Sequence, residues 1–303
     1  MEQKSAWVEF KNECLADKLF DVLVFLLIVL AVGVTFYPFM YVVSISLSSG
    51  AAVNKGLVML FPVDFNLSTY KMVMNYKDLW VSYGNTFYYT FVGTFLNIVF
   101  TCLAAYPLSR KRFFLRKKMN FLLAFTMYFS GGLIPTYVVV TGLGLYNSRL
   151  AMILPVLVSA YNVMICRSAF ESISEELFES AYLEGANDIQ VLYKIAVPLI
   201  KPTLAVLTLY YAVARYNDFF SALLYIGKQN LQPLQLFLRR ILLMASSEIM
   251  QSSGSATAAS AAAQSTIQIR YVCIVLSMVP ILCLTPFIQK YLVKGTMLGA
   301  VKG

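Results

Sequence analysis

The sequence predicts an all-α membrane protein with six transmembrane helices, and three observations support that fold class. Hydrophobic residues make up 59% of the 303 residues and charged residues only 13%, about half the charged fraction of an ordinary soluble domain. Uncharged runs long enough to cross a bilayer as helices recur along the chain. Basic residues concentrate in a few segments between these runs, as expected for loops retained on the cytoplasmic side.

The first uncharged run extends from Val22 to Asn54. A helix needs about 20 residues to cross the hydrocarbon core, whereas the apolar core of a cleaved signal peptide has only about 7 to 15. We therefore expect this run to remain in the protein as the first span.

Five further runs supply the other spans. They are Leu79–Ser109, Met119–Ser148, Leu150–Cys166, the more interrupted Pro202–Gly227, and Tyr271–Gln289. Transmembrane barrels show weaker segments of about ten residues with alternating polarity, so continuous apolar runs argue against strands. Helices satisfy their own backbone hydrogen bonds in lipid, and the prediction is six of them.

The topology follows from one basic segment. Six of the nine residues from Arg110 to Lys118 are Lys or Arg, which places this loop in the cytoplasm and makes the inverted topology unfavourable. Both termini are then cytoplasmic. The predicted organisation is an N-terminal tail 1–20, a transmembrane domain 21–292 and a C-terminal tail 293–303, with a cytoplasmic loop 171–200 and external loops 48–78 and 227–270.

The second external loop has two distinct parts. We expect Pro233–Ala245 to form a short helix on the membrane surface with Arg239 and Arg240 facing water. The Ser/Ala-rich run Ser252–Ala263 is typical of a plain linker.

Composition excludes several kinds of chemistry. The chain has five cysteines far apart and no histidine, so it offers neither a zinc site nor a Ser-His-Asp or Cys-His set. The only Gly-Lys pair, Gly227-Lys228, lacks the remaining residues of a P-loop, so we expect no ATP hydrolysis and no cofactor in this chain. Membrane topology accounts for the net charge of +9 without a nucleic-acid partner.

A polar stretch from Glu175 to Pro198 is too hydrophilic to span the membrane. Acidic residues suit the start of a helix, Gly185 suits its end, and Asn187 or Asp188 can cap a second helix that Pro198 and Pro202 close. Leu177, Ala181 and Glu184 fall near one face of the first helix, where the small Ser180 and Ala181 permit close approach of another surface. The prediction is a helix-turn-helix that docks a partner; the alternative is an amphipathic loop on lipid headgroups, which usually carries basic residues instead.

This stretch resembles the signature loop of ABC importer permeases. The family pattern is Glu-Ala-Ala, three residues, Gly, nine residues and Ile-x-Leu-Pro, and this chain reads Glu179-Ser180-Ala181, Gly185 and Ile195-Ala196-Val197-Pro198 at the same spacing. Two positions depart from it, Ser180 for Ala and Val197 for Leu. The resemblance implies that the ATPase-coupling residues are Glu179, Ser180, Ala181, Gly185, Ile195 and Pro198.

Other stretches are similar to the carbohydrate-import permeases, and within them to the subgroup for complex polysaccharide fragments such as aldouronate or alginate oligosaccharides. These stretches are Tyr128–Tyr137, Arg215–Phe220, Pro233–Arg239 and Gln289–Gly295. The resemblance implies the type I importer fold and a place in the bacterial inner membrane. It also implies a related second permease, two ATPase subunits that bind ATP and Mg, and an extracytoplasmic solute-binding protein that contacts the Pro233–Ala245 piece.

An ion-coupled carrier or channel acting without an ATPase is the alternative function. Such proteins usually place charged residues at mid-membrane, and here only Arg215 and Asp218 qualify. At a spacing of three residues on one helix face they form either a local ion pair that neutralises both charges or, together with Asn217, a polar contact on the substrate path.

Overall fold

The computed structural model describes residues 15–251 and 268–283, and every regular element in these residues is helical. The predicted all-α fold class is therefore confirmed. The chain divides into two compact units, Met1–Val73 with Met244–Leu276 and Met74–Leu243 with Ser277–Gly303, which we call unit 1 and unit 2. The predicted linker Ser252–Ala263, the stretch Gln289–Gly295 and most of both predicted tails lie outside the described residues.

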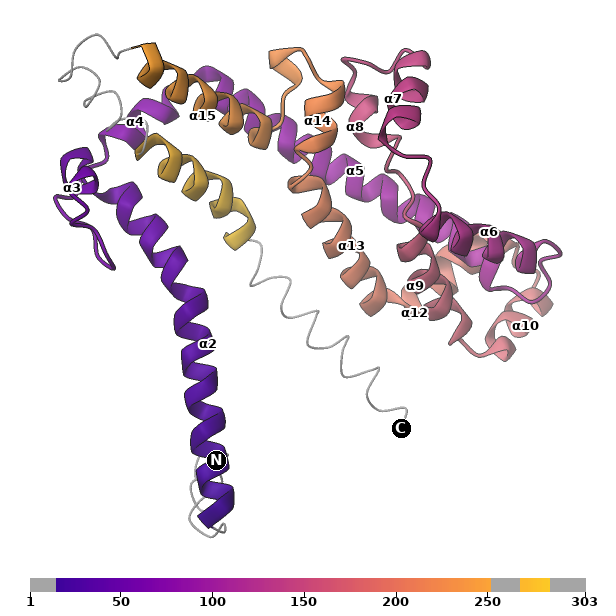
Figure 1. The fold of residues 1–303 in the computed structure, drawn as a ribbon. Coiled ribbons are helices and arrows are strands. Elements are labelled where there is room, and N and C mark those ends of the chain that lie inside the picture. Colours follow the sequence, from indigo (N-terminus) through magenta and orange to yellow (C-terminus); the bar gives the residue numbers. More distant parts are fainter. Residues whose placement is uncertain (1–14, 252–267, 284–303) are drawn as a thin grey trace. The chain divides into compact units, whose positions relative to one another are not determined.

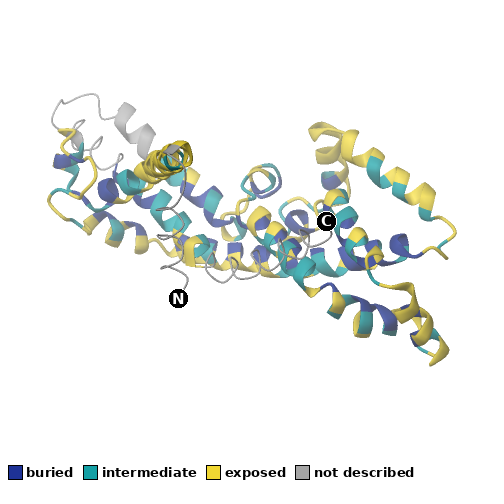
Figure 2. Cartoon of the chain, turned by 90° about the horizontal axis from the view of Figure 1, so that it is seen from below, coloured by how far each residue is buried: buried dark blue, intermediate teal, exposed yellow. Residues whose placement is uncertain are grey.

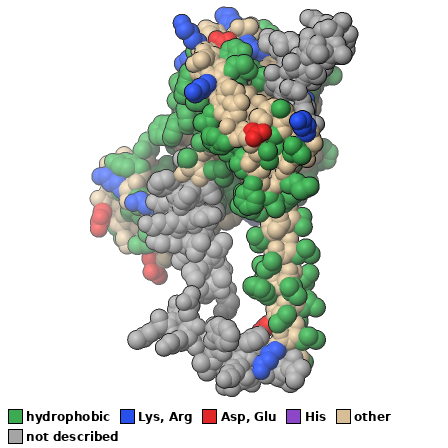
Figure 3. All heavy atoms as spheres, turned by 90° about the vertical axis from the view of Figure 1, so that its left-hand side faces the viewer, with side chains coloured by type: hydrophobic (Ala, Val, Ile, Leu, Met, Phe, Trp, Pro, Cys, Tyr) green, Lys and Arg blue, Asp and Glu red, His purple; other side chains and the backbone are tan. Residues whose placement is uncertain are grey.

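The first span is helix α2, Leu15–Leu47, in unit 1. Its most apolar window of 18 residues has a mean hydropathy of 2.8, and none of that window is buried. Hydrophobic side chains line it along its length (Figure 3). A helix that is apolar on all sides suits lipid or a neighbouring membrane helix.

Helix α2 ends at Leu47, inside the uncharged run and just before the external loop predicted for residues 48–78, because serines end the helix. The Ser48 hydroxyl donates a hydrogen bond to the carbonyl of Ser44 at 2.6 Å and accepts one from the amide of Val63 at 3.0 Å. Ser49 caps a separate short helix, α3 (Gly50–Asn54), by accepting from the amide of Ala52. Serine side chains that bond nearby backbone groups favour such helix ends. Helix α4, Ser68–Met74, follows.

Unit 2 is built around helix α5, Lys77–Ser109, the second predicted span. Helices α9 (Ala160–Glu171) and α13 (Lys201–Tyr216) pack against it (Figure 1). Buried positions recur along α5 from Leu79 to Ser109 (Figure 2). Several of them are polar, which is unusual for a helix in lipid and indicates that this face lies inside a helix bundle.

The third predicted span is not one continuous helix. Helices α6 (Arg116–Tyr128) and α7 (Leu133–Gly142) meet at an angle of 114°. The break contains Gly131 and Gly132, and Gly132 has φ +84°, a backbone conformation that side-chain-bearing residues rarely adopt. An apolar run predicted the span correctly as membrane-compatible but did not predict this turn.

The fourth predicted span is also interrupted. Helix α8 covers Arg149–Ile153 and α9 begins at Ala160, so residues 154–159 form a non-helical segment between them. Pro155 lies in this segment, and proline cannot donate a backbone hydrogen bond and clashes with the preceding turn. We call residues 154–159 the unwound segment.

The fifth predicted span contains two helices, α13 and α14 (Phe220–Tyr225). Because α13 ends at Tyr216, Asp218 lies beyond it, and the carboxylate of Asp218 accepts a hydrogen bond from the amide of Ser221 at 3.0 Å. The prediction that Arg215 and Asp218 share one helix face is therefore wrong.

The external region after α14 contains the 3₁₀ turn η2 (Gln229–Leu231) and helix α15 (Leu234–Gln251). The predicted helix exists and its start packs against α5, while its position at the membrane surface stays a prediction. Side chains in its first turns are buried, and loop carbonyls accept hydrogen bonds from α5, including Leu231 O from the hydroxyl of Tyr89 at 2.8 Å. Arg239 is exposed as predicted, whereas Arg240 forms an ion pair with Asp78 at 3.1 Å.

The sixth predicted span begins with the apolar helix Gln268–Cys283, and its remainder lies outside the described residues. In the described part of the chain, α2 and α5 are each long and apolar enough to cross a membrane alone. Two bent helix pairs, α6 with α7 and Asp188–Leu199 with α13, are also long and apolar enough if each pair counts as one span. Six spans agree with this pattern, and the number stays a prediction.

Candidate functional site

The polar stretch after α9 folds as the predicted helix, turn and helix. Helix α10 covers Glu175–Leu183, and Gly185 follows it with φ +83°. Asn187 starts the next helix with a capping box, in which its side chain accepts from the amide of Gln190 at 2.9 Å and the Gln190 side chain accepts from its amide at 3.0 Å. That helix runs through α11 (Asp188–Val191), the π-helical turn η1 (Leu192–Ala196) and α12 (Val197–Leu199).

Helix α10 has one buried face and one exposed face. Phe178 and Ala181 are only 1% and 6% exposed and pack in the core of unit 2 with Phe170 and Val191. Ala181 therefore faces its own chain and not a partner, contrary to the prediction. The opposite face presents Glu179, Ser180 and Leu183, the last of which is 90% exposed.

Arg110, the first residue of the basic loop, contacts the buried face of α10. Its side chain is buried, and its guanidinium lies 3.7 Å from the centre of the Phe178 ring. The same guanidinium donates to the carbonyl of Phe170 at 2.8 Å and lies 4.0 Å from the carboxylate of Glu175. A cation over an aromatic ring is favourable, more so when desolvated, so Arg110 ties α10 to the end of α5.

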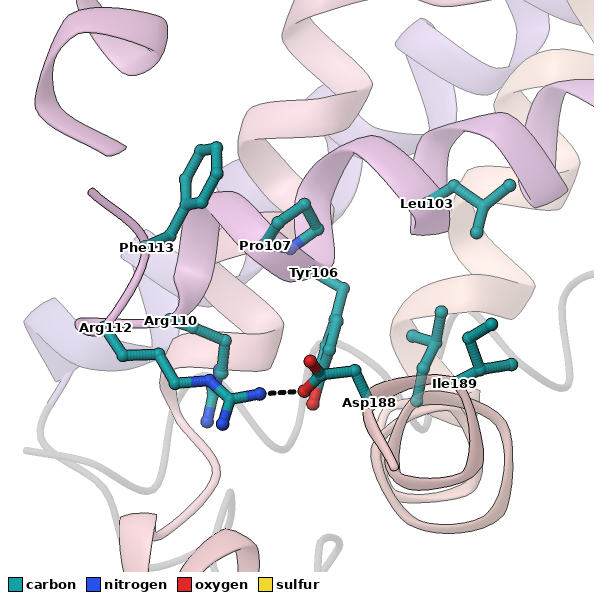
Figure 4. A pocket seen from close by; sticks show the side chains of 9 residues that line it. Leu103, Tyr106, Pro107, Arg110, Arg112, Phe113, Asp188 and Ile189 are labelled. Atoms are coloured by element: carbon teal, nitrogen blue, oxygen red, sulfur yellow. Dashed lines mark hydrogen bonds and ion pairs between the residues drawn. The ribbon is translucent and has the colours of Figure 1, made fainter. Parts of the chain in front are cut away.

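Arg112 ties the turn after α10 to the same loop (Figure 4). Its guanidinium pairs with the carboxylate of Asp188, donates to the hydroxyl of Tyr182 at 2.8 Å and lies 4.2 Å from the Tyr182 ring centre. The Tyr182 hydroxyl in turn donates to Asp188 at 2.8 Å. These side chains adjoin a pocket of about 420 Å³, lined by Leu103, Tyr106, Pro107, Arg110, Arg112, Phe113, Asp188, Ile189 and Leu192.

Glu171, at the end of α9, binds two arginines. Arg116 from the basic loop pairs with it, and Arg167 donates to it at 2.9 and 3.1 Å. Partial burial alone would raise the pKa of Glu171, but the hydrogen bonds from Arg167 and Arg116 outweigh that effect and hold the pKa below its usual value. The carboxylate is therefore charged throughout the neutral range.

Ile195 and Pro198 support the second helix. Ile195 is partly buried and packs against the core of unit 2. Pro198 lies in α12, which directly follows the π-helical turn η1. At Ile200 the chain bends by 86° into α13. The acidic loop, residues 171–200, thus leads directly into a membrane helix.

Arg215 lies on α13 in a buried polar network. Among the described residues its guanidinium forms no ion pair with Asp218, the partner considered from the sequence. Its guanidinium donates to the side chain of Asn97 at 2.7 Å and to the carbonyls of Met152, Ile153 and Val156. Arg215 is 14 residues from the start of α13 at Lys201 and Asn97 is 12 from the end of α5 at Ser109. At about 1.5 Å per residue both residues lie about 20 Å along their helices from these ends, well inside the apolar segments.

A polar pocket of about 320 Å³ adjoins this network. Its lining combines Arg215 and Asp218 with Asn97, Val156, Ser159, Asn162, Tyr210, Tyr211, Ala214 and Ser221. Asn217, the third predicted residue of the substrate path, is exposed beside this group, and its side chain donates back to the carbonyl of Val213. Two of the three predicted residues therefore line one pocket.

The sequence matches a family model described as the inner membrane component of binding-protein-dependent transport systems over residues 81–298. This stretch includes the acidic loop, the polar pocket and the whole of α13. The chain belongs to this family. It is a permease, an integral inner-membrane subunit of an ABC importer, and subunits of this family translocate solute without catalysing a reaction.

Relatives match the permease over nearly its full length. Protein LplC of Bacillus subtilis (strain 168) is 36% identical, with 95% of this chain and 96% of that protein covered. The polygalacturonan/rhamnogalacturonan transport system permease protein YtcP of the same organism is 34% identical, with 95% and 99% covered. In a crystal structure of a bacterial ABC transporter involved in the import of the acidic polysaccharide alginate, one chain is 33% identical with a TM-score of 0.82, covering 92% and 98%.

Residues that act through long-range contacts in the permease were missed by sequence reasoning. Arg110, Arg112 and Arg116 were interpreted only as a topology signal, although each also binds the acidic loop or α9. Within the described residues, the three lysines of the same loop have no such contact. Asn97 was also missed, and its polar side chain inside an apolar run, four residues from Thr101, was the signal that pointed to it.

Proposed function

We propose that the permease forms half of the translocation path for an oligosaccharide derived from an acidic or complex polysaccharide. The support is the pair of relatives named for polygalacturonan/rhamnogalacturonan transport and for alginate import, both at least 33% identical over at least 92% of this chain. A related second permease supplies the other half of the path, and a solute-binding protein delivers the sugar from outside.

The acidic loop is the proposed docking site for a separate ATPase, which binds ATP and Mg. The observation that carries this proposal is the outer face of α10, where Leu183 is 90% exposed beside the exposed Glu179 and Ser180. Leu183 does not pack within the described chain, so this face, which carries Glu179 and Ser180 of the signature loop, is open to a partner. Ala181, Ile195 and Pro198 support this face from within, and Gly185 shapes the turn beside it.

The proposed topology places the acidic loop in the cytoplasm with both termini. The loop shares its side of the membrane with the basic loop, because Arg110 and Arg112 contact it directly. Since basic loops are retained in the cytoplasm, α10 faces the compartment that contains ATP. The loop before α5 and the start of α15 are then external.

The proposed sugar path passes the polar pocket near mid-membrane. Ser159 and Asn162 offer hydrogen-bonding groups, and Tyr210 offers a half-exposed aromatic face on which a sugar ring can stack. ATP-driven closure of the ATPase subunits would move α10 and, through the bend at Ile200, tilt α13 beside this pocket. Inward-open and outward-open states then alternate around one site.

The test uses the complete transporter in proteoliposomes with its binding protein. We expect oligogalacturonates or alginate oligosaccharides to stimulate ATP hydrolysis and to accumulate inside. Gly185→Pro should abolish the stimulation, because proline cannot adopt φ +83° and removes the amide that donates to the carbonyl of Tyr182.

Gly56→Pro is the matched control. Gly56 has φ +66° and an amide that donates to the carbonyl of Val53, but it lies in the first external loop. We expect the control to hydrolyse ATP in response to sugar. Uptake of solute by this chain without any ATPase, with Gly185→Pro indifferent, would replace the proposal with the carrier alternative.

A further inference from the structure

The unwound segment of the fourth span is held by two neighbouring helices. A helix break leaves carbonyls without an intrahelical donor, and in hydrocarbon each unsatisfied group is costly. Here the carbonyls of Met152 and Ile153 accept from Arg215, and that of Val156 accepts from Arg215 at 3.0 Å and from Asn97 at 3.0 Å.

Helix α13 also binds the other end of the segment, and α5 supports that contact. Tyr211, one turn before Arg215 on α13, accepts from the amide of Ser159 at 3.3 Å. Its hydroxyl also lies 2.7 Å from that of Thr101, one turn beyond Asn97 on α5. Residues four apart share a helix face, so Tyr211 and Arg215 face the segment together from α13, while Asn97 of α5 bonds the segment and Thr101 bonds Tyr211.

Gly93 on α5 makes room for the guanidinium. A Cβ atom at Gly93 would lie 3.1 Å from Nε and 3.3 Å from Cδ of Arg215. These separations are tighter than ordinary van der Waals contact, so a Cβ at position 93 would require the guanidinium to shift by a few tenths of an ångström. The placement of Arg215 therefore depends on the glycine at position 93, one turn before Asn97 on α5.

The donors of Arg215 are directed at protein acceptors. Four hydrogen bonds occupy both terminal nitrogens, and the residue is only 6% exposed. A guanidinium has five N–H donors, and the four bonds use up to three of them, one on Nη1 and two on Nη2. The hydrogen bonds of Arg215 are thus made to residues of the pocket wall, and few of its donors remain for a substrate inside the pocket.

We propose that Arg215 is a positioning residue that fixes the unwound segment to α13, so that the pocket wall at Val156 and Ser159 moves with the helix that the ATPase drives. The inference rests on the proposed function, because it takes α13 as the driven helix. It separates the two predicted substrate-path residues that line the pocket: Asp218 stays a candidate ligand, and Arg215 acts through the segment.

The first test compares sugar uptake by Arg215→Lys, Arg215→Met and wild type in the complete transporter. Lysine keeps the charge but cannot reach four acceptors on two elements. We expect the maximal uptake rate to fall by about tenfold or more in both variants, with KM for the sugar within about twofold. Arg149→Lys, on α8 of the same span and exposed, is the control and should transport normally.

A direct ligand of an acidic sugar would behave differently. KM would then rise in Arg215→Met, and more for an oligogalacturonate than for its methyl-esterified, neutral form. That result, or uptake by Arg215→Lys at the wild-type rate, would overturn the positioning role. Co-purification of the second permease and the ATPase with each variant establishes that the complex is assembled.

The second test is a double-mutant cycle with Gly93→Ala. Alone, this substitution should lower the uptake rate several-fold by displacing Arg215. In the Arg215→Met background it should have little further effect, since the atoms that the new Cβ would meet are gone. If the fold-losses in uptake rate of the two single variants instead multiplied in the double variant, the proposal would be contradicted. A wild-type transporter that moves no sugar would instead refute the proposed function itself.

Discussion

At the scale of single residues, the arginines of the basic loop do more than orient the chain. Arg110 stacks on Phe178, Arg112 pairs with Asp188 and Arg116 pairs with Glu171. Arginine suits such contacts better than lysine, because its planar group combines stacking with several directed hydrogen bonds. Each contact fixes one part of the acidic loop to the end of α5 or the start of α6.

Glu171→Gln gives a prediction about pH. The folded pKa of Glu171 lies below the value of 4.5 that it has when unperturbed, so the carboxylate stabilises the folded state above that pH. This stabilisation is lost as the pH falls through the lowered folded pKa. We expect a lower melting temperature for the variant at pH 7, and a difference from wild type that shrinks as the pH falls below 4.5, measured on the detergent-solubilised complex. A constant difference across this range would contradict the assignment.

Phe178→Ala tests the anchor of α10. Removing a fully buried ring, which also carries the Arg110 guanidinium on its face, is expected to cost about 3 to 5 kcal/mol of unfolding free energy. Chemical denaturation of the purified complex measures this. Leu177→Ala, which truncates the neighbouring and half-exposed side chain of the same helix, should cost far less. Equal costs would show that α10 is not anchored through Phe178.

At the scale of elements, local signals predicted the helix-turn-helix well. Gly185 and Asn187 act on their own neighbours, and each has the conformation expected from its chemistry. The roles of Glu179 and Ser180 in docking remain predictions.

The failures at this scale share a cause. The mean hydropathy of a run is insensitive to single residues such as Gly131, Gly132 and Pro155. An apolar run therefore predicts that a segment lies in the membrane but does not predict the turns within it. Contacts such as that of Arg112 with Asp188, 76 residues away, leave no local pattern in the sequence.

Asn187→Ala tests the second helix of the acidic loop. Loss of an N-cap side chain typically costs about 1 kcal/mol, here at the turn that orients α10. We expect faster amide hydrogen exchange at Ile189 and Gln190 and a modest loss of sugar-stimulated ATP hydrolysis. Asn187→Ser, which retains a capping oxygen, should restore both. Unchanged exchange in the alanine variant would show that the cap is dispensable.

At the scale of the whole molecule, the proposed ATPase-docking surface is separate from the packing that holds the fold together. Leu183 offers an apolar contact without supporting the fold, since it is 90% exposed. Leu183→Glu should therefore abolish co-purification of the ATPase while leaving the second permease bound. Leu143→Glu, at an exposed leucine beyond α7, is the control and should retain both. Retention of the ATPase by Leu183→Glu would place the docking surface elsewhere.

The double use of the basic loop has a consequence for biogenesis. Residues 110–118 leave the ribosome before any of the partners Phe170, Glu171, Phe178 and Asp188 has been made. At roughly 5 to 20 residues per second, their charges remain unpaired for seconds, during which the insertion machinery can read them as a signal of sidedness. Once the acidic loop emerges, three of those charges are bound within the protein. The charges that orient the chain during insertion are thus bound by the fold that forms afterwards.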